Sequence, residues 1–297
     1  MFACLVIDQK DARWRRPVPP ALVRVNVPGG APFFRIEAAR RKGKGALKQG
    51  ALPWAEIERA AGRLRTKMLF PEGVQPPALA LPGEQRSAAQ AQLEPGLRAF
   101  APRRLPLLLC LRAAQEALRL SHLPARELRV TVVDQKGLLC RSLEPLVPLA
   151  GSLRVYTPDF GQYRAAAAQL LRRHGVTLIL SDSPACFAQS HVVIADDLSL
   201  FTGRESGLVF TPDAVTARPG CRAVRMRGPI LPGACESLCP PGIDPLLFAC
   251  ALYELCGVKE MERLRFGHYA FDGVSREFSM EELAASVGSR AVAAGGR

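Results

Sequence analysis

Aspartates follow four short apolar segments in the middle of the chain. The segments are LRVTVVD, LRVYT, VTLILSD and HVVIADD, and the carboxylates that end or closely follow them are Asp134, Asp159, Asp182, Asp196 and Asp197. Runs of Val, Ile and Leu separated by turns and helical stretches are typical of buried parallel strands. Ligands of open α/β sheets bind beyond the carboxyl ends of the strands, so the sequence places these carboxylates where a site would lie.

We therefore expect any ligand site to lie along this edge of the sheet. It would be built from the residues that end the strands or begin the following turns: Asp134, Lys136, Gly137, Thr157, Asp159, Ser181, Asp182, Ser183 and Asp196. A nucleotide or a phosphorylated metabolite is the ligand class that this position favours, and Lys136 supplies the nearest positive charge. The sequence has no G-x-S-x-G nucleophile turn and no P-loop, so it assigns no catalytic residue.

The carboxylates themselves suggest a second chemistry. Asp134, Asp182, Asp196 and Asp197 could converge at one edge and hold Mg²⁺ for phosphoryl chemistry, because oxygen ligands suit that ion. Aspartate is also common after strands simply because it caps the next turn or helix. The sequence completes no metal motif, and the nine cysteines do not show the spacing of a structural zinc site.

Helical segments separate the apolar runs. High helix propensity predicts a helix over Tyr163–His174, with Gly175 as its stop. A weaker helix is expected over Leu138–Leu149, where Pro145 and Pro148 interrupt the pattern. The short segment SPACFAQS connects the third and fourth strands, and GLVFTPD and CRAVRMRG are two further expected strands.

This order of elements in residues 128–197 resembles the Rossmann-type NAD(P)-binding domain of shikimate and amino-acid dehydrogenases. The likeness is clearest in YRAAAAQLLRRHGVTLIL followed by SHVVIADD. It implies a dinucleotide cofactor at the strand edge and dehydrogenase activity. The family's G-x-G-x-x-G turn is replaced by DQKGLLC, which keeps only Gly137, and Asp134 would repel a pyrophosphate. The ribose-binding acid falls near Thr157 and Asp159. The resemblance therefore implies a degenerate domain.

The chain as a whole is expected to be an α/β protein with a mostly parallel Rossmann-like sheet and helices on both faces. We divide it into a basic α+β region (1–75), a Pro- and Gly-rich connection (76–105), the Rossmann-like domain (106–230) and a C-terminal helical segment (231–297). In that last segment Asp244 followed by Pro245 predicts one helix start, and Ser279 with Glu282 predicts a capping box at another.

The excess of positive over negative charge lies in the N-terminal part of the chain. Residues 1–126 hold 22 Lys and Arg against nine Asp and Glu, which accounts for the whole net charge of +13. The density is highest in residues 35–67, around Arg40, Arg41, Lys42, Lys44 and Lys48. Such a patch attracts nucleic acid or an acidic protein. A solvated basic loop with no binding function would have the same composition, so the sequence leaves both readings open.

Composition narrows the remaining choices. Apolar residues make up 48% and charged residues 23%, as in ordinary globular proteins. No uninterrupted apolar stretch reaches the ~20 residues of a membrane span, and the first residues have the reverse order of a secretory signal, so we expect a cytoplasmic protein. The leading hypothesis is a degenerate Rossmann-like domain that binds a small ligand or a protein. The alternatives are an active NAD(P)- or Mg²⁺-dependent enzyme, or a nucleic-acid binder.

Overall fold

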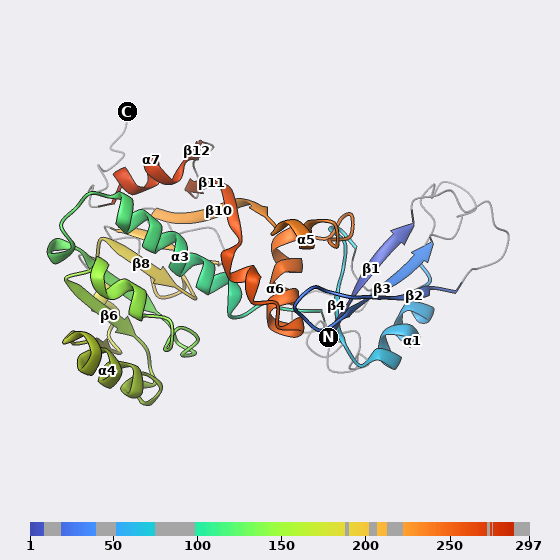
Figure 1. The fold of residues 1–297 in the computed structure, drawn as a ribbon, viewed down its shortest axis with the longest axis horizontal. Coiled ribbons are helices and arrows are strands. Elements are labelled where there is room, and N and C mark those ends of the chain that lie inside the picture. Colours follow the sequence, from blue (N-terminus) through green and yellow to red (C-terminus); the bar gives the residue numbers. More distant parts are fainter. Residues whose placement is uncertain are drawn as a thin grey trace. The chain divides into compact units, whose positions relative to one another are not determined.

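A computed structural model describes residues 1–8, 19–39, 52–74, 99–187, 190–201, 207–212, 222–271, 274 and 276–287. The chain divides into two compact units (Figure 1). Unit 1 comprises Met1–Pro102 and Ile230–Leu264, and unit 2 comprises Arg103–Pro229 and Arg265–Arg297. The segment 231–297 is thus shared between the two units. No helix in the described residues is long and apolar enough to cross a membrane.

Unit 1 is built on a four-stranded mixed sheet in the order β2-β3-β1-β4. Strand β1 (Phe2–Asp8) is parallel to β3 (Phe33–Ala39) and β4 (Lys67–Leu69), and β2 (Ala21–Val25) runs antiparallel to β3. These strands carry the apolar side chains that hold the unit together.

Among the described residues of unit 1, helices α1 (Trp54–Leu64) and α6 (Pro245–Cys256) pack on the strands. Helix α1 buries Ile57 and Ala61 in a cluster with strand residues of the sheet. Helix α6 begins at the predicted Asp244 cap, whose carboxylate accepts from Leu247 N at 2.6 Å. Its Phe248 ring lies edge-on to the ring of Phe2, 5.9 Å away. The short helices α5 (Gly233–Glu236) and η6 (Lys259–Arg263) flank α6 in sequence.

Unit 2 contains an eight-stranded sheet in the order β12-β11-β10-β9-β8-β5-β6-β7. Its parallel strands are β5 (Arg129–Val133), β6 (Ser152–Tyr156), β7 (Ile179–Ser181), β8 (Val192–Ala195), β9 (Leu208–Phe210) and β10 (Arg222–Ile230). Numbered from β5, their order is 3-2-1-4-5-6, which is the strand order of the Rossmann fold. Strands β11 (Arg265–Phe271) and β12 (Glu277–Phe278) form an antiparallel extension.

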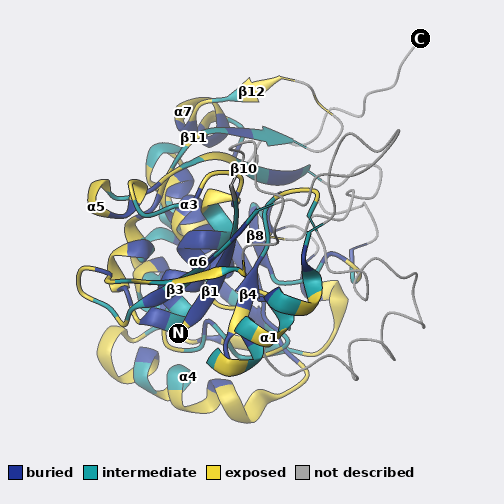
Figure 2. Ribbon diagram, turned by 90° about the vertical axis from the view of Figure 1, so that its right-hand side faces the viewer, coloured by how far each residue is buried: buried dark blue, intermediate teal, exposed yellow. Residues whose placement is uncertain are grey.

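Both faces of the large sheet are buried at its centre. Val133, Val193, Ala195 and Val209 share one face with Cys186 and Phe187 of η5 (Pro184–Phe187) and with Leu198 and Phe201. Alternate residues such as Val192 and Ile194 point to the other face, on which α3 (Leu105–Leu120) packs. Strand β8 is accordingly dark blue in Figure 2.

Helix α4 (Phe160–His174) connects β6 to β7. Because such parallel crossovers are right-handed, α4 lies on the same face of the sheet as α3. Much of its surface is exposed (yellow in Figure 2), and only Tyr163 and Leu170 of this helix are buried. Within the described residues the opposite face carries η5 and the irregular segment of residues 196–201. At the β7 edge of the sheet Ile179 is exposed.

One local expectation was wrong. The helix expected over Leu138–Leu149 is a series of turns followed by the 3₁₀ helix η4 (Glu144–Leu149), because the prolines remove the donors that an α-helix needs. Strand β11, with the sequence RFGHYAF, was not predicted, because its glycine conceals the alternating pattern. A further short 3₁₀ helix, η3 (Ala125–Glu127), leads into β5.

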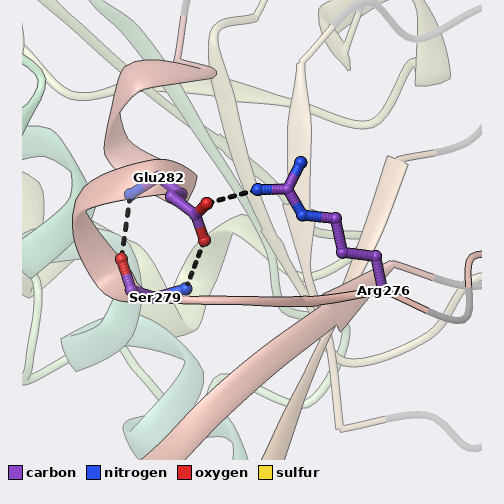
Figure 3. A network of polar contacts seen from close by, with 3 residues as sticks. All are labelled: Arg276, Ser279 and Glu282. Carbon is purple, nitrogen blue, oxygen red and sulfur yellow. Dashed lines mark hydrogen bonds and ion pairs between the residues drawn. The ribbon is translucent and has the colours of Figure 1, made fainter.

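The predicted capping box is confirmed at the start of α7 (Met280–Ala285) (Figure 3). Helix α7 packs on α3. Glu282 N donates to the Ser279 hydroxyl at 3.2 Å, and Ser279 N donates to the Glu282 carboxylate at 2.9 Å. Arg276 forms an ion pair with the same carboxylate. The cap fixes where α7 begins.

Candidate functional site at the switch point of the sheet

The strand order of unit 2 reverses between β5 and β8. Strands β6 and β7 lie on one side of β5, and β9 and β10 lie beyond β8. Asp134 directly follows β5, and Asp196 with Asp197 directly follows β8. Ligands of doubly wound sheets bind in the crevice outside such a switch point, so this pair of strand ends is the candidate site.

Asp134 is fully buried, and its carboxylate binds the turn that follows it. Oδ1 accepts from Lys136 N at 3.3 Å and from Leu138 N at 3.0 Å. Oδ2 accepts from Leu139 N at 2.7 Å and from the Tyr163 hydroxyl at 2.5 Å. Burial, and then the negative charge of Asp134, raise the pKa of Tyr163, so its hydroxyl keeps the proton that it donates. Three backbone donors of the turn and one phenol are therefore satisfied from within the protein.

A dinucleotide does not fit this turn. In a Rossmann domain the backbone N–H groups of the first βα turn, at the start of a helix, bind the pyrophosphate. Here the carboxylate of Asp134 already occupies those donors, and its charge would oppose a phosphate in a buried place. No α-helix follows the turn. The left-handed φ of Gly137, +66°, serves the turn, and a Cβ there would collide with the Gln162 side chain.

The carboxylates after β8 differ from each other. Asp196 accepts from Gln135 N at 3.2 Å through Oδ2, whereas its Oδ1 is buried without a partner. Burial, the charge of Asp134 and that of Asp197 raise the pKa of Asp196 to about 6. Asp197 accepts from Ser199 N at 2.7 Å, and this bond contributes most to lowering its pKa. Of the two carboxylates that follow β8, Asp196 therefore has the raised pKa and Asp197 the lowered one.

The remaining predicted site residues lie along the same edge but serve local turns. The Thr157 hydroxyl accepts from Asp159 N, and Asp159 caps α4 by accepting from Gly161 N at 2.9 Å. Ser181 accepts from Ser183 N at 3.1 Å. Asp182 is exposed after β7. Within the described residues no hydrogen bond joins Asp159 or Asp182 to the three carboxylates at the switch point.

Lys136 is exposed, and its charge lowers the pKa values of Asp196 and Asp197, although other influences outweigh it at Asp196. Sequence reasoning assigned Asp197 only to the Mg²⁺ hypothesis and did not assign Gln135 or Tyr163 to the site. Nothing in the sequence marks Tyr163 as a partner of Asp134, 29 residues away. The basic residues Arg40, Arg41, Lys42, Lys44 and Lys48 lie outside the described residues.

The geometry gives the Mg²⁺ hypothesis no support. In the part of the chain that the structure describes, no three His, Cys, Asp or Glu side chains are arranged to hold a metal ion. Both oxygens of Asp134 and both of Asp197 already accept protein donors. Asp182, which that hypothesis included, belongs to a strand end on the far side of β6 from β5.

Comparisons with known proteins give distant structural likenesses to dehydrogenases. L-tryptophan dehydrogenase from Nostoc punctiforme matches with a TM-score of 0.31 and 13% identity over 88% of this chain and 70% of its own. Quinate dehydrogenase from Corynebacterium glutamicum, in complex with NAD, matches with a TM-score of 0.29 and 15% identity over 77% of this chain and 87% of its own. 5-ketofructose reductase of Gluconobacter sp. strain CHM43 matches with a TM-score of 0.24 and 10% identity over 86% of this chain and 87% of its own.

No protein-family model matches the sequence, and no curated protein matches it significantly. The structural likenesses agree in kind with the resemblance seen in the sequence, but their TM-scores are too low to carry an argument about the site. The Rossmann-like class of unit 2 follows from its own strand order and directions.

Proposed function

We propose that this protein is a degenerate Rossmann-like protein that acts by binding a partner, without dinucleotide-dependent catalysis. The observation that carries the proposal is the Asp134 carboxylate, which takes four donors at the turn where a pyrophosphate would bind. A functional NAD(P) site needs those backbone donors free. Freeing them would leave a buried carboxylate without partners, at a cost of several kcal/mol.

The electrostatics of the switch point support the same proposal. Asp134, Asp196 and Asp197 lie close enough for their charges to affect the pKa of Asp196. The positive charge of Lys136 lowers the pKa values of Asp196 and Asp197 but does not prevent the overall rise at Asp196. A nucleotide or a phosphorylated metabolite would bring further negative charge to this edge. We therefore favour the partner-binding form of the hypothesis over a phosphate-bearing ligand at the switch point.

A thermal-shift panel of NAD, NADP, S-adenosylmethionine, ATP and GTP, with and without Mg²⁺, tests the proposal. A ligand at ~100 times its dissociation constant stabilises the folded state by ~2.7 kcal/mol, which gives a clear shift. We expect that none of these compounds gives a shift that Asp134→Asn alters. A saturable shift with NAD or NADP that is altered in Asp134→Asn would overturn the proposal.

A further inference from the structure

Arg154 is a half-buried cation without an anionic partner. It lies on β6, where its register neighbours are Thr131 on β5 and Ile179 on β7. Its Nε is buried and has no hydrogen-bond partner, and no carboxylate of the described residues pairs with it. A guanidinium N–H that is buried away from water normally donates to an acceptor, because a buried donor without a hydrogen bond costs free energy.

Neighbouring polar groups do not supply that acceptor. The hydroxyls of Thr131 and Ser190 bind each other at 2.7 Å. The Cys186 thiol lies close enough for Arg154 to lower its pKa, but burial outweighs this effect and raises the pKa overall. The thiol is therefore neutral at neutral pH and is no counter-ion for Arg154.

A second unpartnered donor lies on the same face. Tyr156 is two residues along β6 from Arg154, so both side chains leave the sheet on one side. The Tyr156 ring packs edge-on to Phe187 at 5.2 Å, and its hydroxyl forms no hydrogen bond with the described residues. Ile179, beside Arg154 on the edge strand β7, is 45% exposed. Solvent therefore reaches this face at Ile179, while η5 is the described element that packs on it at Tyr156.

We propose that the β6–β7 end of this face binds the anionic group of a small molecule, a carboxylate or a phosphate, with Arg154 as the charge partner and the Tyr156 hydroxyl as a second donor. A planar guanidinium binds both anions through paired N–H groups. The apolar surfaces of Ile179 and the Tyr156 ring offer a contact for the body of the molecule. The site is separate from the switch point, and binding here does not depend on whether a dinucleotide binds there.

The test uses inorganic phosphate and acetate as probes of the full-length protein, by thermal shift and by titration calorimetry at an ionic strength fixed with sodium chloride. Arg154→Gln removes the charge, and Arg172→Gln is the matched control because it removes one exposed charge from α4. We expect saturable binding of one probe to the wild-type protein and to Arg172→Gln, with affinity for Arg154→Gln weaker by roughly tenfold or more. A response to phosphate alone identifies a phosphate site, and a response to acetate alone identifies a carboxylate site.

Two further measurements test the proposal if Arg154→Gln does not fold. Arg154→Lys keeps the charge and loses the planar group, so it should bind the probe more weakly than the wild type. In the wild type, the bound probe should slow alkylation of Cys186 by iodoacetamide, measured by mass spectrometry of that peptide. Equal responses of wild type and Arg154→Gln, or no response beyond that of chloride, would show that Arg154 is only a solvated cation.

Discussion

Replacing Asp134 with Asn should destabilise unit 2, although the two side chains have nearly the same shape. An amide has one oxygen, so an oxygen placed at Oδ1 keeps the bonds from Lys136 N and Leu138 N. Its NH₂ group then faces Leu139 N, whose 2.7 Å bond is lost, while the Tyr163 hydroxyl can turn to accept. Hydrogen bonds to charged groups contribute about 1.5 to 3 kcal/mol each.

We expect a net loss of about 2 to 3 kcal/mol in the free energy of unfolding, because weakening of the two remaining bonds adds to the lost one. Relief of the repulsion between Asp134 and Asp196 partly offsets this loss. Urea unfolding followed by far-UV circular dichroism measures it. The control is Asp159→Asn, which replaces one good helix cap with another and should change stability by less than about 0.5 kcal/mol. Wild-type stability or better in Asp134→Asn would refute the reasoning, because the carboxylate would then not be holding the turn.

Variants at three other positions probe the same structure. The pKa of Asp196 in the folded state, about 6, lies above its ordinary value of 3.8, so folding favours the protonated carboxyl group. The stability that this protonated group contributes is lost as pH rises from about 4 to about 6. Asp196→Asn should therefore melt at a higher temperature than wild type above pH ~6, with a difference that narrows toward pH ~4; a constant difference across this range would contradict the assignment. Tyr163→Phe removes one donor to the Asp134 carboxylate and should lower the free energy of unfolding by about 1.5 to 3 kcal/mol in urea titrations, with a smaller effect in the Asp134→Asn background because the pair is coupled. Ser279→Ala should cost about 1 kcal/mol by the same assay, and Ser279→Thr should recover most of it; an unchanged Ser279→Ala would mean that the capping box does not hold α7 in solution.

Much of the framework of unit 2 could be predicted from the apolar runs. LRVTVVD, LRVYT and HVVIADD became β5, β6 and β8, and their parallel pairing placed the carboxylates on one edge. The pattern worked because buried parallel strands need continuous apolar residues. It failed where the signal is weak, as in β11, whose RFGHYAF sequence mixes glycine and polar residues.

The function of Asp134 could not be settled from the sequence. An aspartate after a strand can bind a ligand or accept from its own turn, and the sequence allowed both. The choice depends on tertiary structure, since Tyr163 approaches from α4 and the turn folds back over the carboxylate. Arg154 was missed for a related reason, because a missing partner becomes visible only when the neighbouring strands are in place.

Amide hydrogen exchange of Lys136, Leu138 and Leu139, measured by NMR with and without a large excess of NAD, tests most directly whether Asp134 closes the switch point. We expect the amides of Leu138 and Leu139 to exchange slowly, because they donate to a buried carboxylate, and we expect NAD to leave all three rates and chemical shifts unchanged. Fast exchange of these amides, or shifts at the turn that saturate with NAD, would show that the donors are free and that the turn still binds a dinucleotide.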